Sequence, residues 1–258
     1  MYESRGKIDF YNIPKKSQIR FSGQTLSWHK DITLNFEKII EISLKSKEEL
    51  KTIIDNLSEN KILKLQLTKD KYELDGFEIK NKKIKIIGEE GAIINGSFRI
   101  ENSDITFENI KFDKISAKGS KVIFKKCKGG KIYGESSEIT IKDSEIYGNE
   151  IRGIDVTEKS ILRIEDSKIY ENGTKGKSYP QIWIGDSTAE IENTEIYNSM
   201  GGTGIYIYNS KSNVKLENVK TWSNNVGIEC NEYGTSVKIK NCEFKDGIDG
   251  NCNLRKYK

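Results

Sequence analysis

Aromatic rings and carboxylates recur at the third position of a series of short apolar segments, such as Gly153–Val156 and Gln181–Ile184. Aromatic rings offer apolar area to the face of a sugar ring while keeping a polar tip, and carboxylates accept hydrogen bonds from hydroxyl groups. We therefore predict a surface that binds a glycan or another extended polymer; the alternative is that exposed strand positions simply favour large residues. The candidate ligand-binding residues are Tyr133, Asp155, Trp183, Tyr206, Tyr208 and Glu229.

Catalysis at this surface would need acidic or basic groups at a suitable spacing. Glycoside hydrolases use two carboxyl groups about 5 to 9.5 Å apart. Asp155 and Glu229 lie three repeats apart, roughly 14 Å at 4.8 Å per repeat, which is too far. Glu158 and Asp186 fall on neighbouring repeats and suit that distance better, although both lie near turns, where exposed acids are common.

A repeated phrase sets the spacing of these residues. It reads apolar, any, apolar, any, Asn or Asp, and alternation of this kind places the apolar side chains on one face of a short strand. The last position of the phrase is here called the anchor. The anchors are residues 109, 126, 143, 166, 193, 218 and 241, and successive anchors are separated by 17, 17, 23, 27, 25 and 23 residues. The copies are Ile105–Asn109, Ile139–Asp143, Leu162–Asp166, Ala189–Asn193, Val214–Asn218 and Val237–Asn241, with a weaker copy at Val122–Lys126.

These repeats predict a solenoid. One such strand cannot bury its apolar face alone, whereas parallel stacking turns the apolar positions into continuous interior ladders. The Asn or Asp anchor comes where the chain must bend, because its side chain bonds local backbone and tolerates unusual dihedral angles. A second short strand follows each anchor after a loop, as in Gly153–Val156 and Gln181–Ile184. In these strands Ser116 is expected to join the outward column of Tyr133, Asp155, Trp183 and Tyr206.

The chain divides into three predicted parts. Residues 1–45 form a small β segment or cap, in which Ile32–Phe36 alternates as a strand. Residues 46–58 form a capping helix with Leu50, Ile53, Ile54 and Leu57 on one face. Residues 59–258 form the solenoid, whose first unpaired edge the helix would cover.

Residues 79–252 resemble the right-handed parallel β-helix superfamily that includes pectate lyases and polygalacturonases. The resemblance implies an all-β fold, with a polymer lying along the outer face of one parallel sheet. The chain lacks the Asn-Thr-Asp, Asp-Asp, Gly-His-Gly and Arg-x-Lys series of the polygalacturonases, and the Arg-x-Pro-x-x-Arg and Trp-x-Asp-His motifs of the pectate lyases. A lyase of this kind would need a base near a calcium-held uronate, for which Arg152, beside Asp155, is the single candidate. The only histidine, His29, lies outside the repeats.

Bulk composition restricts the partners. The 43 Lys and Arg residues against 39 Asp and Glu give a net charge of +4 without basic blocks, so nucleic-acid binding is not indicated. No apolar run approaches the roughly 20 residues of a membrane span. No signal peptide is apparent either, which favours a cytoplasmic location, although a removed leader would leave the same sequence.

The four cysteines show no metal or redox spacing. Because they match no CxxC pattern, we interpret Cys127, Cys230, Cys242 and Cys252 as small core hydrophobes and expect no metal site. The C-terminal segment shows no capping helix, so we expect lysines, another chain or a longer polypeptide to cover the last edge.

Three functions are compatible with these patterns. The leading hypothesis is a non-catalytic or catalytically degenerate β-helix that binds a glycan or other extended polymer, with no cofactor. The second is a polysaccharide lyase or glycoside hydrolase, with calcium only for the lyase and with Asp155, Glu158, Asp186 and Arg152 as catalytic candidates. The third is a structural or protein-interaction scaffold.

Overall fold

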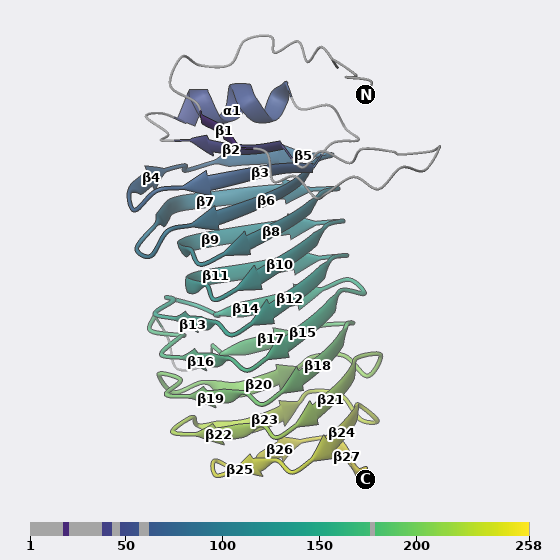
Figure 1. Ribbon diagram of the computed structural model, residues 1–258. Helices are drawn as coiled ribbons and strands as arrows, with labels where there is room; N and C mark the ends of the chain where they lie inside the picture. Colours follow the sequence, from purple (N-terminus) through teal and green to yellow (C-terminus); the bar gives the residue numbers. More distant parts are fainter. Residues whose placement is uncertain (1–17, 21–37, 43–46, 57–61, 176–178, 258) are drawn as a thin grey trace, which may run out of the picture.

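The chain coils into an elongated stack of β-strands (Figure 1). The structure is a computed structural model and describes residues 18–20, 38–42, 47–56, 62–175 and 179–257. Within them, every strand pairing is parallel except that of β1 with β2. A fold of stacked parallel coils was predicted from the repeat, and the structure confirms it.

One wall of the solenoid is a twelve-stranded sheet, here called sheet A. Its first members, β1 and β2, fall within the segment expected to form a small β cap, and β2 pairs with β3 in parallel. In spatial order the strands are β1 (Gln18–Arg20), β2 (Lys38–Ile42), β3 (Ile62–Leu67), β6 (Lys83–Gly88), β8 (Asp104–Glu108), β10 (Lys121–Lys125), β12 (Glu138–Lys142), β15 (Ile161–Glu165), β18 (Thr188–Glu192), β21 (Asn213–Glu217), β24 (Ser236–Lys240) and β27 (Asn253–Lys256).

The remaining strands form a fifteen-stranded sheet, here called sheet B, which splits into two lanes. Its early strands are β4 (Lys71–Glu73), β5 (Phe77–Lys80), β7 (Ile93–Glu101), β9 (Lys111–Lys118) and β11 (Lys128–Glu135). Beyond β11, lane 1 continues its first half and contains β13 (Glu145–Tyr147), β16 (Lys168–Tyr170), β19 (Glu195–Tyr197), β22 (Lys220–Trp222) and β25 (Glu243–Phe244). Lane 2 continues its second half and contains β14 (Ile154–Thr157), β17 (Ile182–Ile184), β20 (Thr203–Ile207), β23 (Val226–Cys230) and β26 (Ile248–Gly250).

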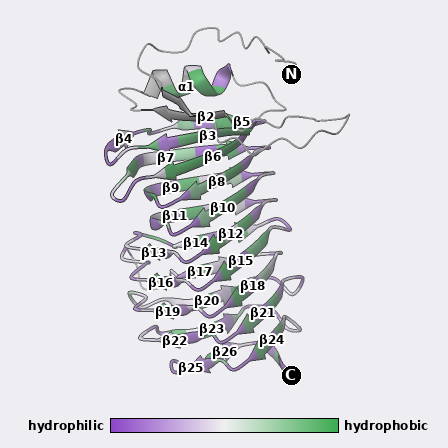
Figure 2. Cartoon of the chain, viewed as in Figure 1, coloured by the Kyte–Doolittle hydropathy of each residue, from purple (hydrophilic) through white to green (hydrophobic). Residues whose placement is uncertain are grey.

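The interior is filled by ladders of equivalent apolar residues. Ile141, Ile164, Ile191 and Leu216 stand in direct register on successive strands of sheet A and are at most 1% exposed. Figure 2 shows the same alternation of hydrophobic and hydrophilic residues along the strands. The inward positions assigned from the repeat are therefore confirmed.

The anchor residues adopt the left-handed conformation that their side chains suggested. Their φ angles lie between 48° and 57° at Asn109, Lys126, Asp143, Asp166, Asn193, Asn218 and Asn241. Asn218 Nδ2 donates to Asn193 Oδ1 at 2.8 Å, and Asn193 Nδ2 donates to Asp166 Oδ1 at 3.1 Å. The three anchors from Asp166 to Asn218 thus form a hydrogen-bonded ladder where their coils turn out of sheet A.

A second polar ladder, of buried serines, leads each coil into sheet A. Ser103 N donates to Ser120 Oγ, Ser120 N to Ser137 Oγ and Ser137 N to Ser160 Oγ, at 3.0 to 3.1 Å. Each hydroxyl of the first three donates in turn to a carbonyl two residues earlier in its own coil. These hydroxyls satisfy backbone donors that would otherwise be buried without a partner.

The predicted capping helix is present as α1 (Lys47–Asp55). Leu50 and Ile54 are 1% and 2% exposed and belong to the core, and the helix lies across the first strands of the stack (Figure 1). Leu57 and the predicted strand Ile32–Phe36 lie outside the described residues. Among the residues that are described, no helix is long and apolar enough to cross a membrane.

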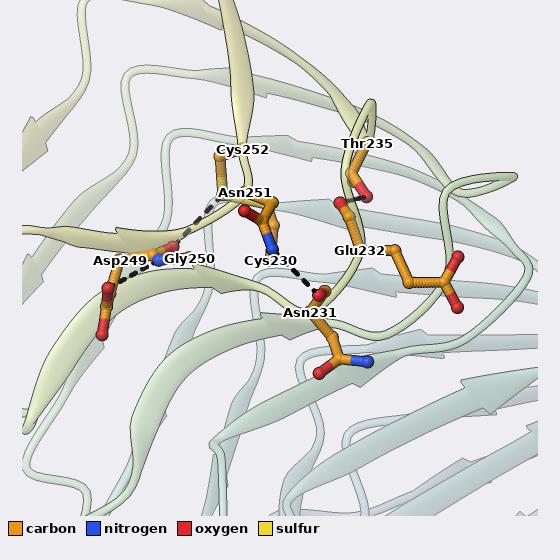
Figure 3. Close-up of a disulfide and its surroundings, with 8 residues drawn as sticks. All are labelled: Cys230, Asn231, Glu232, Thr235, Asp249, Gly250, Asn251 and Cys252. Carbon is orange, nitrogen blue, oxygen red and sulfur yellow. Dashed lines mark hydrogen bonds between the residues drawn. A yellow bond between two sulfur atoms is a disulfide. The ribbon is translucent and has the colours of Figure 1, made fainter.

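The interpretation of all four cysteines as free core residues is wrong for two of them. Cys230 and Cys252 form a disulfide with a Cα–Cα distance of 5.0 Å (Figure 3). The register partner of Cys230 is Gly250, so Cys252 lies two residues beyond that partner. Its Cα atom still falls within the range that a disulfide spans. Cys127 and Cys242 are free, Cys127 buried and Cys242 half-buried.

Candidate functional site

The predicted outward column forms on lane 2 and its continuation in β9 and β11. Register pairs join Ser116 to Tyr133, Tyr133 to Asp155, Asp155 to Trp183, Trp183 to Tyr206 and Tyr206 to Glu229. The column continues to Asp249 on β26, which the sequence reading did not include. Tyr208 follows β20, and its backbone nitrogen donates to Ile184 O at 2.9 Å, so it flanks the column. All six candidate ligand-binding residues therefore lie on the same side of the wall, although Asp155, expected to be exposed, is buried at 5% exposure.

The rings of the column are packed against one another. The ring centroids of Trp183 and Tyr206 are 4.6 Å apart, and those of Trp183 and Tyr208 are 5.4 Å apart, both in stacked geometry. The guanidinium carbon of Arg152 lies 3.9 Å from the centroid of Trp183. Because Arg152 comes from the preceding coil and the tyrosines from the following one, Trp183 is covered on both faces. Tyr208, 46% exposed, is the ring with the most open surface.

Arg152 and Asp155 form the main ion pair of the surface. Arg152 Nη1 donates to Asp155 Oδ2 at 2.7 Å, and the two side chains are 24% and 7% exposed. The Nε of Arg152 is buried and has no hydrogen-bond partner among the described residues. The carboxylate and the Trp183 ring therefore both hold the guanidinium of Arg152 in place.

Lys131 is a cation of this surface that the sequence reading missed. It stands two residues before Tyr133 on β11 and is half-buried. Burial lowers its pKa, against an opposing effect of the Asp155 carboxylate, and the Arg152 and Lys114 charges lower it further. No periodic signal distinguishes this lysine from the other lysines of the chain, because its environment comes from residues of both adjacent coils.

The other acidic candidates lie at turns or in hydrogen bonds. Glu158 and Asp186 have left-handed φ angles of 55° and 48°, and Lys159 N donates to Asp186 O at 2.7 Å, which places the two acids on adjacent coils. Glu229 Oε2 accepts from Thr203 Oγ1 at 2.8 Å. Burial, followed by the Glu229 charge, raises the pKa of Tyr206. The structure thus brings Glu158 and Asp186 together as neighbours, apart from Glu229.

A buried polar network supports the loop that leads into Trp183. Asn172 Nδ2 donates to Gln181 Oε1 at 2.5 Å, and Asn149 Nδ2 donates to Asn172 Oδ1 at 2.6 Å. Asn172 and Gln181 are fully buried, and Gln181 Nε2 donates to Tyr197 O at 2.7 Å. These bonds fix the loop base between lane 1 and lane 2.

Lane 1 carries a second series of rings, the lane 1 stack, that the sequence reading did not treat as a surface. Successive centroids are 5.1, 5.1 and 4.4 Å apart, and the ring planes differ by 4° to 11°. The signal was the aromatic residue four positions after the anchors at 143, 166, 193 and 218. The members are Tyr147, Tyr170, Tyr197 and Trp222.

The outer face of sheet A carries mainly paired charges. Lys85 contacts Glu108 at 2.8 Å, and Lys240 contacts Glu217 at 2.9 Å. Exposed pairs of this kind contribute little to stability and are typical of a solvated sheet face. Within the described part of the chain, no three His, Cys, Asp or Glu side chains gather into a group that could hold a metal.

Comparison with known families identifies the fold. A family model described as "Right handed beta helix region" matches residues 67–244. The chain belongs to this family. The expected right-handed parallel β-helix is therefore confirmed, and no curated protein matches the chain.

Three solved structures are similar to this β-helix at low sequence identity. ORF18 of Geobacillus virus E2 has 11% identity and a TM-score of 0.44, with 78% of this chain and 54% of that chain covered. The A-module of the Azotobacter vinelandii mannuronan C-5 epimerase AlgE6 has 13% identity and a TM-score of 0.33, with 77% and 60% covered. A double mutant of the periplasmic alginate epimerase AlgG has 10% identity and a TM-score of 0.29, with 86% and 85% covered. At these TM-scores the similarities carry no functional argument.

Proposed function

We propose that this β-helix binds a glycan or another extended polymer along the lane 2 column without cleaving it. The observation that carries the proposal is the unbroken register of Tyr133, Asp155, Trp183, Tyr206 and Glu229. These five coils span roughly 19 Å along the axis at 4.8 Å per coil. A surface of this length and narrow width suits a ligand that is itself long and narrow.

The chemistry of the column supports a hydroxyl-rich ligand. Tyr206 and Tyr208 present phenolic edges, Glu229 presents a carboxylate and Arg152 presents a guanidinium held by Asp155. Hydroxyl groups bond to all of these. Because Trp183 is covered on both faces, we assign it the role of fixing Arg152 and the tyrosines, and we assign ring contact with the ligand to Tyr208.

A glycan array tests this proposal. The wild-type protein should bind at least one polysaccharide, and Tyr208→Ala should weaken that binding about tenfold through loss of ring contact and a hydrogen bond. Tyr257→Ala is the control, because it removes a ring whose hydroxyl bonds to Glu217 on sheet A, a different wall of the solenoid. Absence of any glycan hit, or equal loss in both variants, would contradict the proposal.

A polysaccharide lyase or hydrolase is the second candidate, and Lys131 favours it. A half-buried lysine with a lowered pKa beside Arg152 and Asp155 is a better base than Arg152. Any array hit should therefore be tested for new reducing ends and unsaturated uronates. If the wild type shows turnover and Lys131→Met abolishes it while binding persists, the protein is a lyase and the proposal of binding without cleavage is wrong.

A further inference from the structure

The lane 1 stack ends at Tyr147, and the rung beyond it carries no side chain. Register pairs join Gly129 to Ile146 and Lys128 to Glu145, so Gly130 occupies the rung that would stack on Tyr147. The coil before that places Asp113 at this rung, because Gly129 pairs with Phe112 and Lys131 with Lys114. The ring ladder therefore stops at an empty position one coil high.

Backbone packing keeps this rung empty. A Cβ atom at Gly130 would lie 1.7 Å from Asp113 O, and one at Gly129 would lie 2.1 Å from Phe112 O. Both distances are far below van der Waals contact, so no side chain fits at either position. The double glycine is thus required by the close approach of two coils, and it leaves one face of Tyr147 without a protein ring against it.

The empty rung opens as a depression of about 590 Å³. The double glycine and Tyr147 line it, together with charged and amide residues that are here called its rim. The polar rim residues are Lys111, Asp113, Asn149 and Glu150. The depression lies on lane 1 and contains none of the residues of the lane 2 column.

We propose that this depression binds one neutral pyranose ring, stacked on the open face of Tyr147. The height of one coil, about 4.8 Å, matches the thickness of a single flat ring, as the 5.1 Å spacing of Tyr147 and Tyr170 shows for a protein side chain. The sugar completes the stack as a further rung. This site is additional to the proposed polymer column and does not depend on it.

The rim charges select a neutral sugar. Asp113 Oδ2 accepts from Gly96 N at 2.8 Å, which fixes that carboxylate at the rim. Glu150 is paired with Lys175 at 2.6 Å. Both carboxylates accept hydrogen bonds from hydroxyl groups, and Lys111 supplies a donor. Together with Lys175 the two acidic and two basic side chains cancel, so a charged sugar gains no net attraction. A plain aromatic compound would leave these polar groups without partners.

Ligand-detected NMR with single sugars tests the site. Wild-type protein is titrated with glucose, galactose and N-acetylglucosamine as neutral probes, glucuronate as a charged probe and phenol as an aromatic probe. At least one neutral sugar should bind saturably and more tightly than glucuronate or phenol. Saturable binding of none of the neutral sugars, or preference for glucuronate or phenol, would overturn the proposal.

Four variants separate stacking from a general loss of structure. Tyr147→Ala should weaken the sugar affinity about tenfold, and Tyr147→Phe should restore it to within about twofold, because the ring alone does the stacking. Trp222→Ala removes the far end of the same stack, and Trp183→Ala alters the lane 2 column; both should leave the sugar affinity unchanged. Wild-type affinity in Tyr147→Ala, or an equal loss in Trp222→Ala, would refute the stacking site. A loss in Trp183→Ala would assign the sugar to the polymer column instead.

Discussion

Single residues in the left-handed conformation turn every coil, and one of them is poorly suited to it. Asn and Asp occupy this conformation readily, whereas other L-residues with a Cβ atom pay about 1 to 2 kcal/mol. Lys126 has a φ of 52° at the position where neighbouring coils use Asn109 and Asp143. The weaker copy of the repeat is thus also the strained one.

Replacing Lys126 by glycine should stabilise the protein by about 0.5 to 1 kcal/mol, because the relief of strain exceeds the added entropy of the unfolded chain. Lys125→Gly is the matched control, since Lys125 is equally exposed but lies in strand β10. It should destabilise by about 0.5 to 1 kcal/mol. Urea unfolding measures both changes, and a loss of stability in Lys126→Gly would show that this turn is not strained.

The buried thiol of Cys127 predicts a pH dependence at the residue scale. Burial raises the pKa of Cys127 to about 11 from a usual value near 9.0. Between these two values the unfolded thiol has lost its proton while the folded one keeps it, so the folded state binds more protons and stability falls as pH rises. The stability that the buried, protonated thiol contributes is fully present below pH 9 and is lost as the pH rises to about 11.

Comparison with Cys127→Ala isolates this effect from the titration of tyrosines and lysines. The wild type should lose roughly 2 kcal/mol more than the variant between pH 9 and 11, measured by urea unfolding under reducing conditions. Parallel stability curves for the two proteins would mean that Cys127 is accessible to solvent.

At the scale of the element, paired ladders define the turns on either side of sheet A. The anchors lead the chain out, with side-chain bonds linking Asp166, Asn193 and Asn218. Serines lead it in, and the nitrogen of Ser103 bonds to the hydroxyl of its equivalent in the next coil. The serine hydroxyls bond to buried backbone nitrogens, so their loss leaves a donor without a partner.

Ser120→Ala should therefore cost about 1 to 3 kcal/mol, because the Ser103 nitrogen loses its buried acceptor. Ser116→Ala, on the outward face of β9, should change stability by less than about 0.5 kcal/mol. Thermal unfolding of the two variants gives the comparison. Equal small effects would indicate that water replaces the missing hydroxyl.

The same ladders show what the sequence could predict. Alternation and regular anchors were enough to assign inward Ile141 and Ile164 and the outward file from Tyr133 to Glu229, because a two-residue period and a coil period together fix both face and height. Orientation of the rings was not predictable. Whether Trp183 offers a face or is covered depends on Arg152, which lies in a loop of different length in each coil.

At the scale of the whole molecule, the last coil and the lane 1 face were the least predictable. No anchor follows position 241, so nothing in the repeat placed Cys252 within disulfide distance of Cys230. Tyr147 and Gly130 occupy the same place in the repeat, four residues after their anchors, yet only the stacking of the coils shows that the glycine leaves one face of the ring open.

The polymer column on lane 2 is the central claim, and a single-tryptophan titration tests it most directly. The chain has three tryptophans, so Trp28→Phe with Trp222→Phe leaves Trp183 as the only reporter. We predict a saturable change in its fluorescence when a polysaccharide is added, with about tenfold weaker binding after Tyr208→Ala. The matched protein keeps Trp222 as its single tryptophan. A fluorescence change seen only in that protein, or no change in either protein with any polysaccharide, would contradict the account.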